Sequence, residues 1–242
     1  MPLNFAAAGC GALHGAVGQE AAGVQTETVQ AAGHSYLIMR AAAGTEVRTS
    51  VTRPDVSDGS VLLSVAGAFT GDDLTTVCGD HVVTGTELKG YDDVTLTGHL
   101  LSVDGKVSIR PQSQLQQSIE QAKRCHGWLL QQCYIVEHGV GHTERIPQAI
   151  IDRQACIIYR AACLLRDGTF AVVQGADKQL PGEFVDGLVG IGAQEALYLD
   201  MGSWAYGWWR PVGTAPIREL AEHYGNTRYQ SNWLTIVRPG VK

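Results

Sequence analysis

The stretch RQACIIYRAACLLRDGTFAVVQG, residues 153–175, contains the clearest fold signal in the chain. Two apolar runs, 153–165 and 169–175, flank the tripeptide Arg166-Asp167-Gly168, which is typical of a tight turn. Apolar runs on both sides of such a turn predict two neighbouring strands joined as a β-hairpin. We therefore expect the core to be a β-sheet built around this hairpin.

Further strand patterns lie on both sides of this hairpin. Apolar or β-branched runs separated by turn residues predict strands at 35–40, 46–51, 61–66, 81–84, 94–102, 106–110, 128–137, 195–200 and 232–238. The dipeptide Asp104-Gly105 is typical of a two-residue hairpin turn. Helical spacing predicts a helix from the capping-box residue Ser113 to about Arg124, and another that begins at Pro181. These elements favour an α+β fold: a single domain with a mixed, largely antiparallel β-sheet core and a few helices.

Composition divides the chain into two parts. Residues 1–33 are rich in Ala and Gly without a clear period, which predicts an N-terminal segment that is only partly ordered. Residues 34–242 carry the strand and helix patterns and are expected to form one domain, since a chain of 242 residues can bury a sizeable core. No run of about 18 apolar residues indicates a transmembrane helix, and no secretory signal is visible at the N-terminus.

The charge distribution argues against one large class of partners. The net charge is −6 and is spread along the chain, whereas a nucleic-acid binder needs a basic face. We therefore expect no nucleic acid as a partner. A few arginines in one pocket would still allow a small anionic ligand. The sequence leaves the oligomeric state open.

Metal and redox chemistry are not indicated either. The six cysteines include no C-x-x-C pair, so a zinc ribbon is not expected. His138 and His142 have the spacing of helical metal ligands, but Gly139 and Gly141 oppose a helix. We expect no metal site and no cofactor. Buried thiols are the simplest interpretation of four cysteines that lie among apolar residues, namely Cys125, Cys133, Cys156 and Cys163.

The stretch ALYLDMGSWAYGWWR, residues 196–210, is the strongest candidate for a ligand site. Asp200 follows an apolar strand pattern and precedes Gly202-Ser203, an arrangement that presents a carboxylate at a sheet edge. Aromatic rings beside a carboxylate suit the faces of sugars. The alternatives are an aspartate that bonds the amides of its own turn and an aromatic cover over the core. The aromatic residues concerned are Trp204, Tyr206, Trp208 and Trp209.

A second carboxylate, Glu137, ends the predicted strand 128–137 and is followed by His138 and, in the next loop, Arg145. Two carboxylates at neighbouring strand ends would meet the minimum requirement for glycosidic chemistry, which needs an acid and a nucleophile or base. Gln132 lies in the middle of the same strand, where a buried amide needs partners. These residues are expected to join Asp200 in one site.

Arg160 lies inside the apolar strand pattern 153–165. A buried charge is costly unless it is paired or binds an anion, and Arg suits a bidentate carboxylate or phosphate. The alternative is a structural salt bridge to Asp200 or Glu137. Arg145 and Arg210 are secondary candidates for anion ligands.

At these residues the second half of the sequence resembles the phosphodiester glycosidase family, in a divergent bacterial form. The similar motifs are Tyr134-Ile-Val-Glu-His-Gly139, Arg160-Ala-Ala162 followed by Asp167-Gly168, a helix over 183–191 leading to Ala196-Leu-Tyr-Leu-Asp-Met-Gly-Ser203, and Ser231-Asn-Trp233. The resemblance covers roughly residues 60–238.

The sequence departs from the family pattern at three places. Ala161 stands where the family has Thr, and Met201 stands where it has the first Gly of its Asp-Gly-Gly motif. The family's Asn-Gly-Gly-Phe-Phe motif has only a degenerate counterpart in Gly67-Ala-Phe-Thr70. Because that motif contributes to the family's site, its loss bears directly on whether activity is retained.

The resemblance implies hydrolysis of a sugar-1-phosphodiester, such as a GlcNAc-1-phosphodiester, in an envelope or extracellular glycan, and hence a location outside the cytoplasm. It implies that Arg160 holds the phosphate, that Asp200 is the nucleophile or stabilises the oxocarbenium-like transition state, and that Glu137 is the partner carboxylate. The expected substrate-binding residues are Thr70, Gln132, His138, Arg145, Gly202, Ser203, Trp204, Trp208 and Arg210.

Two other functions remain open at this point. The degenerate first motif is compatible with a non-catalytic glycan-binding protein on the same scaffold. A purely structural or interaction domain is the third possibility, and it predicts that Arg160 and Asp200 simply pair with each other in a closed core.

Overall fold

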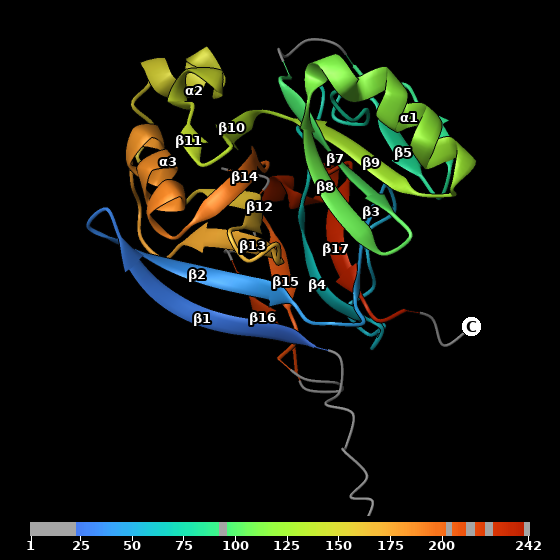
Figure 1. Ribbon diagram of the computed structural model, residues 1–242, viewed down its shortest axis with the longest axis horizontal. Coiled ribbons are helices and arrows are strands. Elements are labelled where there is room, and N and C mark those ends of the chain that lie inside the picture. Colours follow the sequence, from blue (N-terminus) through green and yellow to red (C-terminus); the bar gives the residue numbers. More distant parts are fainter. Residues whose placement is uncertain (1–22, 92–95, 202–204, 212–215, 221–224, 240–242) are drawn as a thin grey trace, which may run out of the picture.

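The computed structural model describes residues 23–91, 96–201, 205–211, 216–220 and 225–239. They form one domain of three antiparallel sheets (Figure 1). The first sheet has the order β1 (Val24–Ala31), β2 (His34–Ala41), β13 (Phe170–Gly175), β12 (Arg160–Leu165), β14 (Ala193–Tyr198), β10 (Tyr134–Glu137) and β11 (Val140–Gly141).

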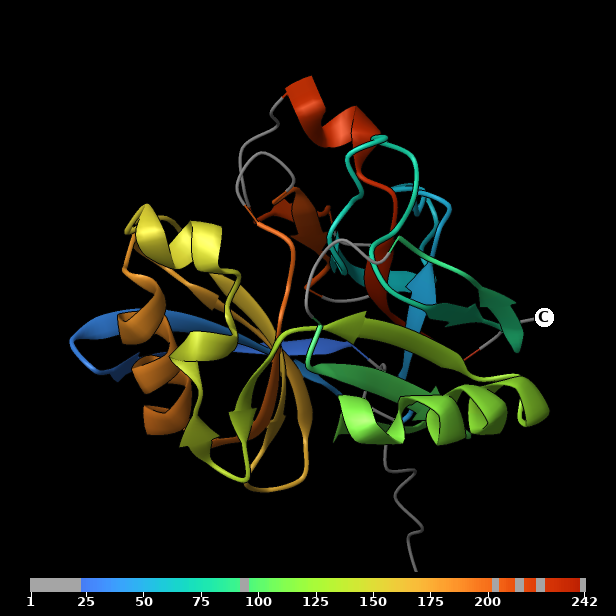
Figure 2. The same ribbon diagram turned by 90° about the horizontal axis from the view of Figure 1, so that it is seen from above.

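The other two sheets have five strands each. The second sheet runs β16 (Arg218–Glu219), β15 (Gly207–Trp209), β4 (Val61–Ala66), β17 (Trp233–Val237) and β3 (Glu46–Ser50). The third runs β6 (Thr86–Leu88), β5 (His81–Val83), β9 (Trp128–Gln132), β7 (Gly98–Val103) and β8 (Lys106–Pro111). Figure 2 shows the three sheets grouped around a common centre.

Three α-helices cover the outer faces of the first and third sheets (Figure 1). The helices are α1 (Leu115–Arg124), α2 (Gln148–Asp152) and α3 (Pro181–Gly190). One apolar cluster fills the space between the first sheet and α3, and another packs α1 on the third sheet. The largest apolar contact between sheets lies at the centre, where residues from all three sheets pack together. The fold is thus mostly β with few helices, which is consistent with the expected α+β class.

The hairpin predicted around Arg166-Asp167-Gly168 is confirmed. β12 and β13 pair antiparallel from Arg160 opposite Gln174 to Leu164 opposite Phe170. The Asp104-Gly105 hairpin is also confirmed, with β7 and β8 joined through two residues of positive φ, 50° and 71°. This is the backbone conformation that a type I′ turn needs. The expected mixed sheet is wrong in detail, because every pair of named strands in the described residues is antiparallel.

The single long strand expected at 128–137 is wrong. The chain leaves the third sheet after Gln132 and enters the first sheet at Tyr134, so that β9 and β10 belong to different sheets. At the crossing the side-chain Oε1 of Gln132 accepts the backbone N–H of Cys133 at 2.8 Å. This bond satisfies an N–H group that leaves the ladder of β9, since a buried N–H without a partner is costly.

Other boundaries also differ from expectation. The strand expected at 153–165 begins only at Arg160, and α1 begins without a side-chain cap from Ser113. The expected division at residue 33 falls within the β1–β2 hairpin. Cys156 is exposed rather than buried. The described residues contain no helix long and apolar enough to cross a membrane.

Gly187 in α3 leaves room for a buried tyrosine. A Cβ at this position would overlap the hydroxyl of Tyr36, which is fully buried and donates to Oε1 of Gln179 at 2.6 Å. We expect Gly187→Ala to lower the free energy of unfolding by about 3 kcal/mol, because a well-packed interior does not absorb an extra methyl group. Gly182→Ala in the same helix is the control, since its Cβ would meet only Thr143 at 3.9 Å. Urea unfolding of both variants measures the difference, and equal stabilities would contradict the packing argument.

Candidate functional site

Asp200 lies where the first sheet joins the second. β14 ends at Tyr198, and two residues later the backbone N–H of Asp200 donates to the carbonyl of Gly67 at 2.9 Å. Gly67 follows the last residue of β4 directly. The hydrogen bond therefore ties the end of β14 to the end of β4, and the Asp200 side chain is only 5% exposed at this junction.

The Asp200 carboxyl is neutral near pH 7. Burial raises the pKa of this group to about 8, and the backbone N–H groups of Met201 and Thr70 only partly offset that effect. A carboxyl without enough compensating charge or hydrogen bonds keeps its proton when it is taken out of water. Burial thus favours the protonated form of Asp200, which is the form that a general acid needs.

Polar residues from two other chain segments lie at the same junction. The hydroxyl oxygens of Thr70 and Ser231 are 3.1 Å apart. The side chain of Asn232 accepts the N–H of Ala68 at 2.7 Å and donates to its carbonyl at 2.9 Å. Thr70, one of the expected substrate-binding residues, lies at this junction. Asn232 was noticed in the sequence only as part of a motif, without a role.

Two aromatic rings border this junction. The ring centroids of Phe69 and Tyr198 are 5.7 Å apart. Burial, together with the nearby charge of Asp200, raises the pKa of Tyr198 well above its usual value, so its hydroxyl is protonated. Among the described residues, this aromatic contact with the segment 67–70 therefore comes from Tyr198 in β14.

Gln132 is linked to the end of β14 through the residue that follows it. Tyr198 donates its N–H to the carbonyl of the next residue, Cys133, at 2.9 Å. The Gln132 side chain is fully buried, and its Nε2 has no hydrogen-bond partner among the described residues. An unpartnered buried donor is rare and calls for a ligand or water. Strand alternation puts Gln132 on the face of Leu130, whose side chain packs beside Gly67.

His81 is a site candidate that the sequence reasoning missed. It lies directly opposite Leu130 in the third sheet, so its side chain shares that face. His81 is fully buried, its Nε2 has no partner among the described residues, and burial lowers its pKa to about 4. The ring is therefore neutral at pH 7. In the sequence, His81 ends the tripeptide Gly79-Asp80-His81, which follows the degenerate motif Gly67-Ala-Phe-Thr70, but no role was assigned to it.

Arg160 does not pair with Asp200 or Glu137, so the alternative of a structural salt bridge to either carboxylate is wrong. Its Nε and Nη2 donate to Oε1 of Gln174 at 2.9 and 2.5 Å, and Gln174 donates onward to the carbonyl of Leu220 at 2.9 Å. The guanidinium is fully buried, and its Nη1 has no partner among the described residues. Burial lowers the pKa of Arg160 to about 9, which still leaves it charged at pH 7.

Removing one partner of the Arg160–Gln174 contact is expected to destabilise the fold more than removing both. Gln174→Leu leaves a buried charge without its acceptor and is expected to cost about 3 kcal/mol. The double variant Arg160→Met with Gln174→Leu removes both polar groups and should cost less than Gln174→Leu alone. Urea unfolding of the two single variants and the double variant measures this cycle. A double variant less stable than Gln174→Leu would show that Arg160 stabilises the fold by other contacts.

Glu137 lies at the opposite end of β14 from Asp200. β10 and β14 are antiparallel, with Val136 opposite Ala196, so Glu137 is next to the start of β14 while Asp200 follows its end. About five residues of extended chain separate them, or roughly 16 Å. Paired glycosidase carboxylates are about 5 to 9.5 Å apart. The expected pair of catalytic carboxylates is therefore wrong.

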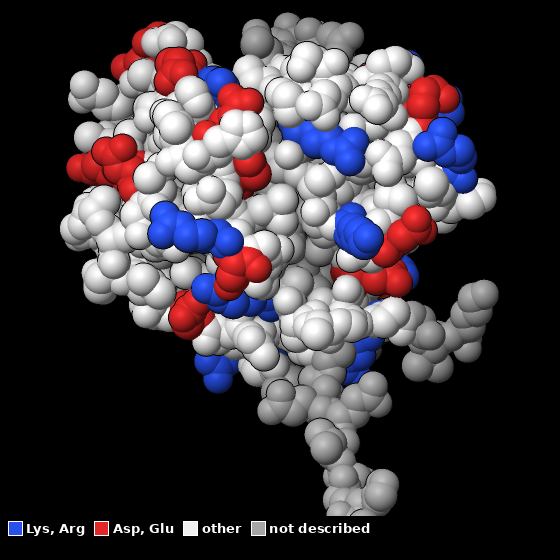
Figure 3. Space-filling view, viewed as in Figure 1, with Lys and Arg blue, Asp and Glu red and all other residues white. Residues whose placement is uncertain are grey.

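His138 and Arg145 accompany Glu137 and not Asp200. Arg145 Nη2 donates to Glu137 at 2.8 Å, and His138 Nδ1 lies 2.9 Å from Glu195. Acidic and basic side chains thus pair with one another at this end of the first sheet. On the face of the molecule shown in Figure 3, acidic and basic side chains are likewise interspersed.

Arg210 and Trp208 also lie away from Asp200. The N–H of Arg210 donates to the carbonyl of Leu62, near the start of β4, whereas Gly67 follows the end of that strand. Trp208 is 1% exposed and packs with Val61 and its apolar neighbours. Trp208 is therefore part of a hydrophobic cover and does not face a sugar. The remaining expected residues, Gly202, Ser203 and Trp204, lie outside the described residues.

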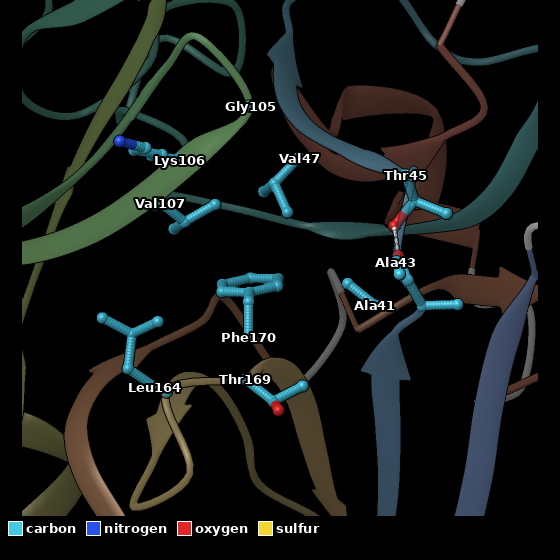
Figure 4. A pocket seen from close by; sticks show the side chains of 13 residues that line it. Ala41, Ala43, Thr45, Val47, Gly105, Lys106, Val107, Leu164, Thr169 and Phe170 are labelled. Carbon is cyan, nitrogen blue, oxygen red and sulfur yellow. Dashed lines mark hydrogen bonds between the residues drawn. The ribbon is translucent and has the colours of Figure 1, made fainter.

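A cavity of about 590 Å³ lies where three turns meet, at the far end of β12 from Arg160. Figure 4 shows Val47, Val107, Leu164 and Phe170 around it, with the ammonium group of Lys106 directed away from Phe170. This lining offers no acid or base to a reaction. Within the described residues, no group of three or more His, Cys, Asp and Glu could hold a metal ion.

Comparisons with known proteins give a likeness of fold. No protein-family model and no curated protein sequence matches the chain. The catalytic domain of zebrafish N-acetylglucosamine-1-phosphodiester α-N-acetylglucosaminidase, auto-inhibited by its pro-peptide, superposes with a TM-score of 0.60 at 9% identity, over 90% of this chain and 83% of that one. A hypothetical protein from Synechocystis superposes with a TM-score of 0.56 at 12% identity, and the chain spans only 62% of its length. The chain thus shares the fold of a phosphodiester glycosidase domain, and at these identities the likeness extends to the fold alone.

Proposed function

We propose that this protein is a glycoside hydrolase that cleaves the bond between a sugar and the phosphate of a sugar-1-phosphodiester, with Asp200 as the proton donor. The observation that carries the proposal is the buried, neutral carboxyl of Asp200 at the end of a central strand. A carboxyl whose pKa lies near the working pH is matched to general acid catalysis. The likeness of fold to a glucosaminidase catalytic domain supports the reaction class.

In this proposal Asp200 gives its proton to the oxygen that links phosphate to sugar as the bond between that oxygen and C1 of the sugar breaks. Water adds to C1, and the proton that the water loses returns to Asp200, so that the products are the free sugar and a phosphomonoester. Negative charge collects on the departing phosphate, and N–H donors held in place beforehand stabilise it. Arg160 Nη1 and Gln132 Nε2 are suited to that task because no described residue accepts either N–H. An envelope or extracellular glycan would be the source of the substrate, which would require export of the protein.

The test is release of free sugar from UDP-GlcNAc and from a GlcNAc-1-phosphodiester. We expect turnover by the wild-type protein and a loss of about 10²–10⁴-fold in kcat for Asp200→Asn, which cannot donate the proton. Asp104→Asn makes the same chemical change in an exposed hairpin turn and should keep full activity. Equal rates for Asp200→Asn and the wild type would overturn the role of Asp200.

The alternative of a non-catalytic glycan-binding protein predicts a different pattern. It expects GlcNAc-containing ligands to bind without release of product, and binding to survive in Asp200→Asn. No turnover by the wild type on a broad panel of sugar phosphodiesters would therefore reject the hydrolase.

A further inference from the structure

Two arginine side chains lie over tryptophan rings. One ring belongs to the second sheet and the other to the third sheet. The guanidinium carbon of Arg48 is 5.1 Å from the ring centroid of Trp128, and that of Arg53 is 5.4 Å from Trp233. Each cation is attracted to the electron-rich face of its ring, which fixes its position on the surface. This holds the two guanidinium groups in place before any ligand arrives.

Both arginines line one open cavity of about 340 Å³. It lies between the edge strand β3, the turn that follows β3, and the start of β9. Its volume falls at the lower end of the range for small-molecule sites, about 300–1,000 Å³. The polar and aromatic residues of its lining are Arg48, Thr49, Ser50, Thr52, Arg53, Thr84, Trp128 and Thr235.

The cavity carries positive charge on a protein whose net charge is −6. Glu46 accepts from Arg48 Nε at 3.0 Å and from Nη2 at 2.6 Å, and thus partly neutralises that side chain. Arg53 donates to the carbonyl of Thr227, and among the described residues it has no carboxylate within ion-pair distance. Arg53 is exposed as a residue, so the guanidinium N–H groups that Thr227 does not use are able to bind an anion.

The wall beside Arg53 is rigid and rich in hydroxyl groups. Ser50 donates its hydroxyl to the carbonyl of Thr52 at 2.7 Å and accepts the N–H of Thr52 at 3.0 Å. These bonds hold the turn after β3 in one conformation, with Thr52 exposed. Hydroxyl groups, an indole ring and a guanidinium fork together match the hydroxyls, the apolar ring face and the charged group of an acidic sugar.

We propose that this cavity is a binding site for a saccharide unit that carries a phosphate or carboxylate group. The site is separate from Asp200. Val61, at the start of β4, lines the cavity, whereas Gly67 beside Asp200 follows the end of that strand. Six residues of extended chain correspond to about 20 Å. The site would hold an anionic glycan on the protein whether or not Asp200 is catalytic.

The test follows the NMR resonance of the indole N–H of Trp128, which lines the cavity. This resonance is assigned by its absence from the spectrum of Trp128→Phe. We titrate ¹⁵N-indole-labelled protein with GlcNAc-1-phosphate, glucuronic acid, neutral GlcNAc and inorganic phosphate. We expect saturable shifts of this resonance with the two acidic sugars, and at least tenfold weaker affinity in Arg53→Gln and in the double variant Arg48→Gln with Arg53→Gln. Arg153→Gln, an exposed arginine elsewhere, is the matched control.

Each other outcome overturns the inference. Inorganic phosphate binding as tightly as GlcNAc-1-phosphate would reduce the site to a general anion site, and neutral GlcNAc binding equally well would remove the role of the arginines. Unchanged affinity in Arg53→Gln would reject the site altogether. The titration is repeated in Asp200→Asn, so that a lack of ligand binding at the cavity can be distinguished from a lack of hydrolytic activity at Asp200.

Discussion

Asp200→Asn is expected to become increasingly more stable than the wild type as the pH rises, while its kcat is about 10²–10⁴-fold lower. The pKa of Asp200 is about 8 in the folded protein and near 4 in an unfolded chain. Between these values the unfolded state loses a proton that the folded state keeps. The wild-type free energy of unfolding therefore falls as the pH rises from about 4 to 8, by up to roughly 5 kcal/mol.

Asparagine has nearly the shape of the neutral carboxyl but does not titrate, so the variant escapes this loss. We expect the two proteins to have about the same free energy of unfolding at pH 4. The difference in favour of the variant should then grow steadily up to pH 8. Urea unfolding at pH 4, 6 and 8 measures the difference. Asp104→Asn, in an exposed turn, should stay within about 0.5 kcal/mol of the wild type throughout. A wild type that is more stable than Asp200→Asn at pH 8 would show that Asp200 is ionised in the fold.

Asn232→Ala is expected to have a comparable effect of opposite sign, about 4 kcal/mol of lost stability, together with reduced activity. Asn232 is 1% exposed and bonds both the N–H and the carbonyl of Ala68, as a neighbouring strand would. The alanine leaves two buried backbone groups without partners, each costing about 1–3 kcal/mol, and also leaves a small cavity.

The effect on activity follows from the position of Ala68. It is next to Gly67, whose carbonyl accepts the N–H of Asp200, so a displaced segment 67–68 no longer positions the carboxyl. Urea unfolding and kcat, measured below the unfolding range, check both parts. Asn232→Asp keeps the oxygen that accepts from Ala68 but loses the donor, and it should fall between alanine and the wild type. Full stability in Asn232→Ala would contradict the bridging role.

The sequence predicted best what depends on neighbouring residues. Asp104-Gly105 and Arg166-Asp167-Gly168 each specify a turn by their own backbone preferences, so both hairpins were found. The strand at 128–137 was mispredicted because both of its halves are apolar. The change of sheet at Cys133 depends on β7 and β14, which lie far away in the chain.

The same limit applies to the candidate site. Asp200 and Thr70 were identified because a strand end and a motif marked them. Glu137 was assigned to the site because it too ends a strand, but a sequence does not state that β10 and β14 run in opposite directions. No local pattern gives His81 or Asn232 a role, since only the folded chain leaves the ring nitrogen of one unpartnered and brings the amide of the other to Ala68.

The junction at Asp200 also has a consequence for the order of folding. Its hydrogen bonds join Gly67 to Asp200 and Ala68 to Asn232, the latter pair 164 residues apart in sequence. Contacts between such distant segments close large loops and slow folding. The hairpins should therefore form early and the junction late, so that a refolding chain recovers its β-structure before it recovers any function that depends on Asp200.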